Sequence, residues 1–278
     1  MKHLRLCCVA PHAPILVPDI GRDDLAEVPG TCDALGALAR EIDALGPDTV
    51  VIVSPPHLRL ASRDAFPVKT GRSFFGDLSR FRAPGSAVSL RTDGVLLDAL
   101  TETARLAGVP LHRDTGERED DWGALVPLLL LAPPSAQIVA INACPHLGYS
   151  EHALLGAALR DAVEESGRNA VFIASGDMSH RLKPGAPSGY SPRGKEFDLA
   201  VVEAMRSGDL GAVFNIDPRL SDEAGEDCLW SLAVLAGTIE GHDAEIEVLS
   251  YEGSFGVGYM VARVMPGGKG ARGRPAAV

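Results

Sequence analysis

Three histidines in this 278-residue sequence each follow a short apolar run that is typical of a buried β-strand. They are His12 after residues 4–10, His57 after residues 49–54, and His180 after residues 170–175. In an open α/β sheet, ligands bind beyond the carboxyl ends of the strands. We therefore expect the three imidazoles to meet at one edge of a sheet, where imidazoles commonly bind metals or transfer protons.

A metal site built on His12 and His57 needs a carboxylate, because two imidazoles and one carboxylate leave positions open for substrate and dioxygen on Fe(II). Zinc uses the same ligand types with a bound water. Four acidic residues cluster in SDEAGEDCLW, at the start of the helix-like run 226–239: Asp222, Glu223, Glu226 and Asp227. Acidic residues also favour helix N-termini for purely electrostatic reasons, and the spacing alone does not choose among the four.

His180 is then a candidate acid/base, because its titration range suits proton transfer near neutral pH. Asp177 lies three residues earlier and either orients His180 or caps the following segment. The competing interpretation is an ordinary loop histidine beside a capping aspartate.

The elements that must position these residues alternate along the chain. Strand-like runs lie at 4–10, 49–54, 137–143 and 170–175, with helical patterns at 31–46, 92–107, 150–167 and 194–207 between or after them, and two late strands at 245–251 and 258–264. Such alternation predicts an α/β fold with a central mixed, mostly parallel sheet and helices on both faces. Residues 60–90, which include several arginines, are expected to form loops around the pocket.

Composition narrows the function classes. The net charge is −11 and the pI about 5.2, which disfavours a nucleic-acid partner. No apolar run approaches a membrane span, so we expect a cytoplasmic protein. Five cysteines without a CxxC pair favour buried thiols over disulfides or a zinc ribbon. One domain over residues 1–266 and a disordered tail at 267–278 are expected.

Several motifs together resemble the class III extradiol dioxygenase superfamily: the catalytic β-subunit family of protocatechuate 4,5-dioxygenase and its Memo relatives. The motifs are APHAP with His12, VIVSPPH with His57, DDWGALVPL at 120–128, IASGDMSHRL at 173–182, RGKEFDL at 193–199, EAGEDCLWSL at 223–232 and GVGYMVARV at 256–264. The resemblance implies non-haem Fe(II), a catechol-like aromatic substrate cleaved with O2 in aromatic catabolism, and assembly as a homo-oligomer or with a small partner subunit.

The resemblance also implies roles for individual residues. His12 and His57 match the two iron-binding histidines, and His180 matches the second-sphere acid/base histidine. Glu226 best matches the third ligand, with Glu223 next. Memo-type relatives have a Cys at that position, so a shifted register would place Asp227 or Cys228 there instead.

Trp122 departs from the pattern, because the family usually has a His in this segment. An indole donates one hydrogen bond and accepts no proton, although it can stack on a ring or close a pocket. We expect Trp122 and Asp121 to line the substrate pocket. The departure keeps two further functions open, namely a Memo-like metal-binding protein without ring cleavage and a zinc-dependent enzyme at the same site.

Overall fold

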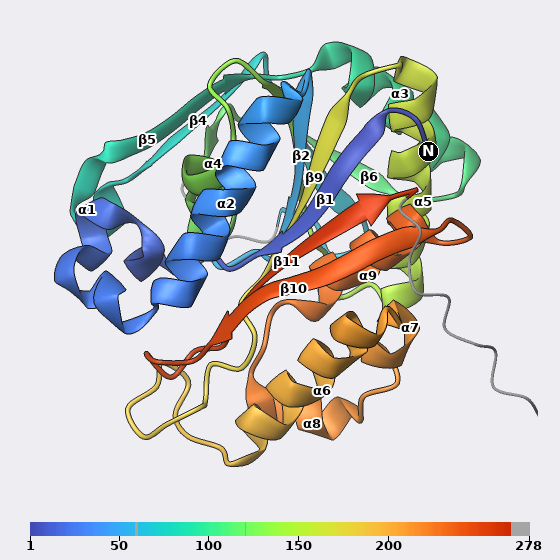
Figure 1. Cartoon of the computed structure of the whole chain (residues 1–278). Coiled ribbons are helices and arrows are strands. Elements are labelled where there is room, and N and C mark those ends of the chain that lie inside the picture. The colour runs from blue at the N-terminus through green and yellow to red at the C-terminus, as the bar shows by residue number, and fades with distance from the viewer. Residues whose placement is uncertain (59–60, 120, 268–278) are drawn as a thin grey trace, which may run out of the picture.

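The structure, a computed structural model, describes residues 1–58, 61–119 and 121–267. Its central element is an eight-stranded mixed sheet. In spatial order its strands are β10 (Ala244–Glu252), β11 (Tyr259–Pro266), β1 (Leu4–Ala10), β9 (Ala170–Ser175), β2 (Thr49–Ser54), β8 (Gln137–Asn142), β3 (Phe66–Lys69) and β6 (Leu111–Asp114). The four central strands β1, β9, β2 and β8 run parallel, whereas β11 pairs with β1 and with β10 in the antiparallel sense. The predicted α/β class is confirmed (Figure 1).

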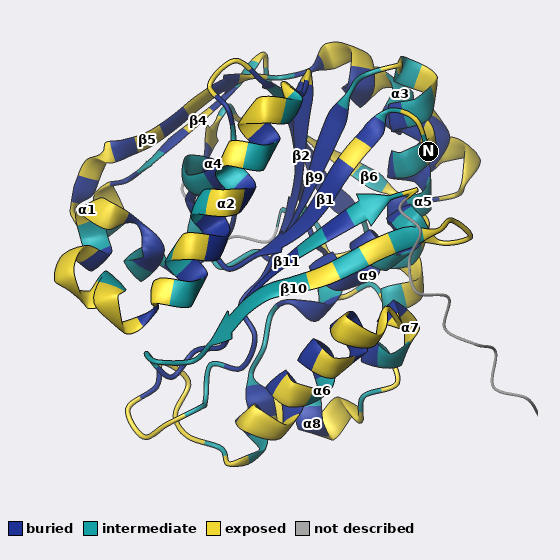
Figure 2. Ribbon diagram, viewed as in Figure 1, coloured by how far each residue is buried: buried dark blue, intermediate teal, exposed yellow. Residues whose placement is uncertain are grey.

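The central strands are buried on both faces, which explains their continuous apolar sequences. All six residues of β2 and all six of β9 are buried, and Figure 2 shows these strands as the dark interior of the molecule. Alternate side chains enter different hydrophobic clusters: Val51 and Val53 join one, while Val50 and Ile52 join the other. The period-two alternation of a strand thus supplies both layers of the core.

Helices cover both faces of the sheet. One cluster takes side chains from α3 (Gly94–Leu106), α5 (Tyr149–Ser166), α6 (Arg193–Ser207), α7 (Leu210–Val213), α8 (Pro218–Ala224) and α9 (Leu229–Ile239). The other takes side chains from α2 (Pro29–Leu45), α4 (Trp122–Leu131) and the 3-10 helix η1 (Pro14–Leu16). Two short helices, α1 (Pro18–Gly21) and the 3-10 helix η2 (Arg22–Glu27), connect η1 to α2.

The expectation of loops over residues 60–90 is wrong. Within the described part of this stretch lie β3, β4 (Ser73–Leu78), the 3-10 helix η3 (Ser79–Phe81) and β5 (Ala83–Arg91), and a second sheet pairs β5, β4 and β7 (Arg118–Glu119). Phe74 is buried and Phe75 exposed, as expected for a strand with one covered face. In β5, buried Val88 and Leu90 are separated by exposed Ser89, an alternation that the sequence offered as a signal for a strand.

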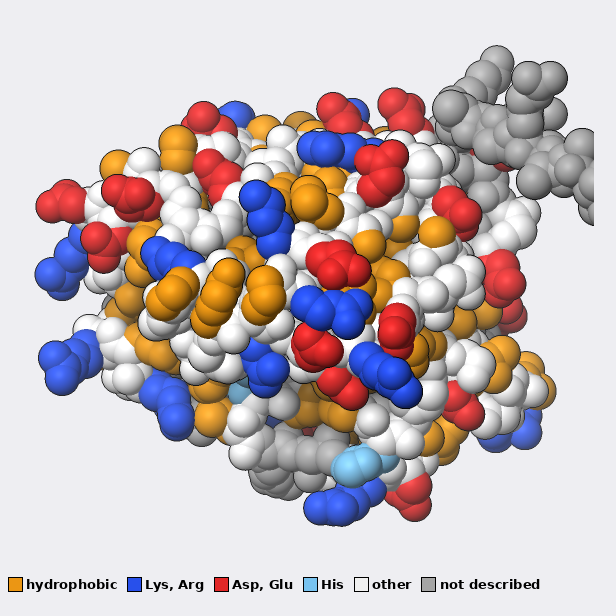
Figure 3. Space-filling view, turned by 90° about the horizontal axis from the view of Figure 1, so that it is seen from below, with side chains coloured by type: hydrophobic (Ala, Val, Ile, Leu, Met, Phe, Trp, Pro, Cys, Tyr) orange, Lys and Arg blue, Asp and Glu red, His pale blue; other side chains and the backbone are white. Residues whose placement is uncertain are grey.

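The cysteines are free and mostly buried, as the composition predicted. All five cysteines are free, and four of them are buried. Among the described residues, no helix is both long and apolar enough to cross a membrane. On the face seen from below, acidic and basic side chains are interspersed with hydrophobic ones (Figure 3). The predicted tail lies outside the described residues from 268 onward.

Candidate metal centre

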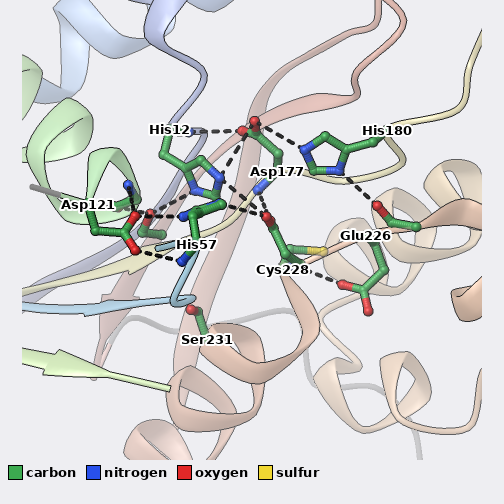
Figure 4. Close-up of polar contacts among 12 residues, drawn as sticks. His12, His57, Asp121, Asp177, His180, Glu226, Cys228 and Ser231 are labelled. Atoms are coloured by element: carbon green, nitrogen blue, oxygen red, sulfur yellow. Dashed lines mark hydrogen bonds and ion pairs between the residues drawn. The ribbon is translucent and has the colours of Figure 1, made fainter. Parts of the chain in front are cut away.

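Parallel register brings the three histidines to one edge of the sheet, as the sequence predicted. Ala10 at the end of β1 lies opposite Ser175 at the end of β9, and β2 runs parallel to β9 on its other side. The ring centroids of His12 and His57 are 4.6 Å apart. His180 reaches the same region from the segment after β9 (Figure 4).

His12 is almost completely buried, with 1% of its surface exposed. Its backbone N–H donates to Oδ1 of Asp177 over 2.9 Å, and its Nδ1 lies 3.1 Å from Oγ of Ser175. Its Nε2 is buried without a hydrogen-bond partner, 3.4 Å from Oδ2 of Asp227. Burial lowers the pKa of His12, but the charges of Asp177 and Asp227 outweigh it and raise the pKa.

His57 lies between two carboxylates. Its Nδ1 is 2.7 Å from Oδ1 of Asp121, and its Nε2 is 3.2 Å from Oδ2 of Asp227. Burial lowers the pKa of His57, but hydrogen bonds to Asp121 and Asp227 and their charges outweigh it, raising the pKa to about 9. The carboxylates therefore create a negative potential around both imidazoles, which favours a cation.

Asp227 completes the cluster. Its Oδ1 accepts from the backbone N–H of Asp177 over 2.8 Å, which directs Oδ2 toward the two histidines. Burial opposes ionisation, but the neighbouring imidazoles overcome it and hold the pKa of Asp227 well below its usual range. His12, His57 and Asp227 each offer a ligand atom, and these atoms lie within 4.8 Å of one another.

Glu226, which the resemblance indicated as the third ligand, turns away from the histidines (Figure 4). Its carboxylate accepts from the backbone N–H groups of Cys228 and Leu229 and from Oγ of Ser221, so it satisfies the free N–H groups at the start of α9. Burial raises its pKa to about 7. The structure therefore places Asp227, one of the four acidic residues considered, where Glu226 was expected.

Glu223 and Cys228, which were also candidates for the third ligand, lie apart from the histidines. Glu223 is half-exposed and its Oε1 is 3.6 Å from Arg193. Cys228 is buried beside Gly176, where any side chain larger than hydrogen would collide with the Cα of Cys228. Neither residue joins the group formed by the histidines and Asp227.

His180 and Asp177 lie side by side next to the metal centre. Nδ1 of His180 is 2.8 Å from the carbonyl of Gly225; because a carbonyl only accepts, Nδ1 carries the proton. Its Nε2 is 3.8 Å from Oδ2 of Asp177, which is also 3.8 Å from Nε2 of His12. Both residues line the adjoining cavity, so Nε2 of His180, the nitrogen that the Gly225 carbonyl leaves free, faces Asp177 and the candidate ligands.

A cavity of about 730 Å³ opens beside these residues. Its walls are mainly apolar and aromatic, and they include Pro14, Ile15, Phe81, Trp122, Pro187, Phe255, Val257 and Tyr259. Trp122 stacks on His57 with 4.4 Å between ring centroids, and the guanidinium of Arg80 lies 5.6 Å from the Trp122 ring. The cavity can hold a small aromatic ring directly beside the metal centre.

Of the two residues expected in the pocket, the structure places only Trp122 on its wall. Asp121 lies behind His57, where its carboxylate accepts from the backbone N–H groups of His57, Leu58 and Gly123 and caps α4. An aspartate that satisfies these donors is not available to a substrate. Asp120, the residue before it, lies outside the described residues.

The donor set fits a divalent transition metal. Two imidazole Nε2 atoms and one carboxylate oxygen converge, and the Nε2 of His12 is buried without a partner, which is costly unless a ligand satisfies it. Ser175, which contacts Nδ1 of His12, was not predicted as a site residue. The sequence signal that could have identified it is its position as the last residue of a buried strand, at the same edge as the histidines.

Residues 6–262 match the model of a family described as the catalytic LigB subunit of aromatic ring-opening dioxygenase. Protein CA_C1420 of Clostridium acetobutylicum is 34% identical over 273 residues, which cover 91% of this chain and 56% of that protein. A 2-aminophenol 1,6-dioxygenase beta subunit from a Pseudomonas species is 30% identical over 206 residues, which cover 66% of each. The chain thus spans between half and two thirds of the length of these curated relatives.

The fold is shared with a solved structure. The crystal structure of an uncharacterized protein, JW3007 from Escherichia coli K12, superposes with a TM-score of 0.59, covering 94% of this chain and 99% of that one. The sequence identity is 17%, so this likeness bears on the fold alone.

Proposed function

Because the chain belongs to the family of catalytic LigB subunits of aromatic ring-opening dioxygenases, we propose that it is a non-haem Fe(II) extradiol-type dioxygenase that cleaves a catechol-like aromatic. We assign His12, His57 and Asp227 as the ligands. The convergence of their ligand atoms, with the buried Nε2 of His12 left unpartnered, carries this proposal. The open side of the cluster faces the aromatic-lined cavity.

When bound, the ferrous ion supplies open coordination positions for the substrate hydroxyls and for dioxygen. The chain itself supplies proton transfer and orientation. His180 accepts a substrate proton at Nε2, because its Nδ1 is occupied by the carbonyl of Gly225. Trp122, held flat on His57, forms a wall against which an aromatic ring can pack.

Asp177 links the proton-transfer residue to the metal ligands. Its Oδ1 holds the backbone of His12, and its Oδ2 faces both His12 and His180. A proton on Nε2 of His180 would therefore be stabilised by the Asp177 carboxylate. We propose His180 as the acid/base and Asp177 as the residue that positions it.

The test is reconstitution of the full chain with Fe(II) without oxygen, followed by admission of air with a panel of catechols and 2-aminophenol. We expect oxygen uptake and a yellow ring-cleaved product from at least one substrate. His180→Gln is expected to lower kcat by about 10²- to 10⁴-fold with iron content unchanged, and His146→Gln, which changes an exposed imidazole, serves as the matched control. Stoichiometric iron without any cleaved product from the panel would reject the ring-cleavage proposal.

A second candidate function is metal binding without ring cleavage, and Trp122 favours it. The indole stacks on His57 at the place where the family usually has a histidine. Because an indole accepts no proton, position 122 cannot supply the proton transfer that a histidine there would. This candidate predicts metal binding, its loss in His12→Ala and His57→Ala, and no oxygen uptake.

The metal itself also requires a direct test, since two imidazoles and a carboxylate suit zinc as well as iron. Metal analysis of protein purified without added metal separates the two ions. Stoichiometric zinc, with activity that withstands iron chelation, would replace Fe(II) by zinc in the proposal.

We further propose that the protein assembles either with itself or with a small partner subunit. One relative carries the name of a beta subunit. Light scattering of the purified chain separates the two modes of assembly, because self-association predicts a multiple of 29.2 kDa without any added protein.

A further inference from the structure

We propose that the cap and first residues of α4 (residues 121–123) position both metal-binding histidines, Asp121 directly and Gly123 through Ser175 at the end of β9. Each contact keeps the Nδ1 proton of an imidazole turned away from the metal centre, so that Nε2 is the atom presented to the ion. The inference rests on the proposed metal site and identifies the residues that orient its ligands.

The contact to His57 is direct. Asp121 Oδ1 lies 2.7 Å from Nδ1 of His57, and a carboxylate that accepts from several backbone N–H groups has no proton to donate. Nδ1 of His57 therefore carries the proton of this bond. Nε2 then faces Asp227 and the candidate ion, the arrangement in which a carboxylate fixes the orientation of a metal-binding histidine.

The contact to His12 runs through a hydroxyl. Ser175 Oγ donates to the carbonyl of Gly123 over 2.5 Å, and a hydroxyl has only one proton. Its oxygen must therefore accept from Nδ1 of His12 across the 3.1 Å contact. Nε2 of His12 is then the nitrogen turned toward Asp227 and the candidate ion, and it is this atom that is buried without a partner.

Both contacts originate from one short segment, residues 121–123. Between the two contact residues, Trp122 stacks on His57. A side chain at Gly123 would lie 2.9 Å from Cε1 of His57 and 2.9 Å from the carbonyl of Pro55, so only glycine allows this close approach. The segment in which the sequence departs from the family pattern is thus the one that holds both imidazoles.

The experiment uses the full chain, labelled with ¹⁵N-histidine and loaded with Zn(II), a diamagnetic probe of the same site. Zinc affinity is measured by competition with a chelator, and imidazole ¹⁵N shifts identify the nitrogen that binds the metal. In the wild type we expect Nε2 coordination and a protected Nδ1–H for both His12 and His57. Ser175→Ala should remove the protection at His12 alone and weaken zinc binding about 10- to 100-fold.

Asp121→Asn should have the same effect at His57, because an amide cannot accept from every donor that the carboxylate serves. The matched control is Ser231→Ala, which removes another buried hydroxyl that donates to a backbone carbonyl, that of Val53 over 3.3 Å; it should leave affinity and shifts unchanged. If Asp121→Asn fails to fold, Ser175→Ala still tests the inference at His12. This substitution removes only one oxygen atom, so we expect the variant to fold.

Coordination through Nδ1 of either histidine in the wild type would overturn the inference. So would a Ser175→Ala protein that keeps the His12 Nδ1–H signal and binds zinc within about twofold of the wild type, well short of the 10- to 100-fold loss typical of an outer hydrogen-bond partner. A wild type that binds no zinc overturns both this inference and the proposed metal site. Normal zinc binding with the expected variant effects, but no cleavage of any catechol, rejects only the proposed reaction.

Discussion

Glu226 and Asp227 are adjacent in the sequence but have opposite surroundings. Glu226 satisfies the backbone N–H groups at the start of α9, whereas Asp227 directs one oxygen toward both histidines. Both residues lie in the short connection between α8 and α9, where their side chains point in different directions, so one serves the helix and the other the candidate ion. At the scale of the residue, the candidate metal centre depends on which way a single side chain points.

Substituting Asp227 and Glu226 separately tests which carboxylate is the third metal ligand. Asp227→Asn should weaken metal binding by more than the roughly 10- to 100-fold expected for an outer hydrogen-bond partner, because it removes the charged donor itself. Glu226→Gln keeps an oxygen for the N–H groups of α9 and should bind metal like the wild type. Isothermal titration with Zn(II) measures both, and the reverse ranking would assign the ligand to Glu226.

At the scale of the element, α6 supports the segment that carries His180. Asp198 on α6 is fully buried; its Oδ1 accepts from the N–H of Ser179 and its Oδ2 from the hydroxyl of Tyr251. The carboxyl thus ties a helix, a sheet strand and the His180 segment together. Burial raises its pKa to about 6, although these hydrogen bonds partly offset the effect.

This shift predicts a pH dependence of stability. In the unfolded chain Asp198 loses its proton near pH 4, whereas the folded protein retains it until about pH 6. The folded state therefore binds more protons in this interval, so the contribution of Asp198 to the free energy of unfolding falls as pH rises from about 4 to 6, by about 2–3 kcal/mol.

Urea unfolding at a series of pH values measures this contribution as the difference between the wild type and Asp198→Asn. The difference should change across about pH 4–6 and stay constant above about pH 7, where the carboxyl is ionised in both states. Asp98→Asn, at an exposed position on α3, is the control. A pH-independent difference between wild type and Asp198→Asn would contradict the prediction.

At the scale of the whole molecule, the candidate metal centre joins segments that are distant in the sequence. His12, His57 and Asp227 come from three separate connections at the edge of one sheet. An ion bound by all three must favour the folded state, since the unfolded chain does not hold them together.

Thermal unfolding tests this coupling. Free Zn(II) at about 100 times its Kd should raise the free energy of unfolding by about 2.7 kcal/mol. Asp227→Asn should lose most of this stabilisation at the same metal concentration. Equal stabilisation of both proteins would show that the ion binds elsewhere.

The sequence by itself determined six strands of the sheet, several of the long helices and the approximate place of the site, whereas β3 and β6 were not predicted. Buried parallel strands need continuous apolar runs, and amphipathic helices need a 3.6-residue period, so β1, β2, β8, β9 and the helices α2, α3, α5 and α6 were predictable. The ends of such strands share one edge of the sheet, which brought His12, His57 and His180 together in the prediction.

Only the tertiary structure decided which neighbouring groups complete the site. The local sequence does not distinguish two adjacent acidic residues. The directions in which the side chains of Asp227 and Glu226 point therefore depend on how α9 packs against the sheet. The placement of Asp121 behind His57, and of Ser175 between His12 and Gly123, depends on contacts across more than 50 residues of chain. Local periodicity contains no information about such contacts, because they exist only once the strands and α4 are assembled.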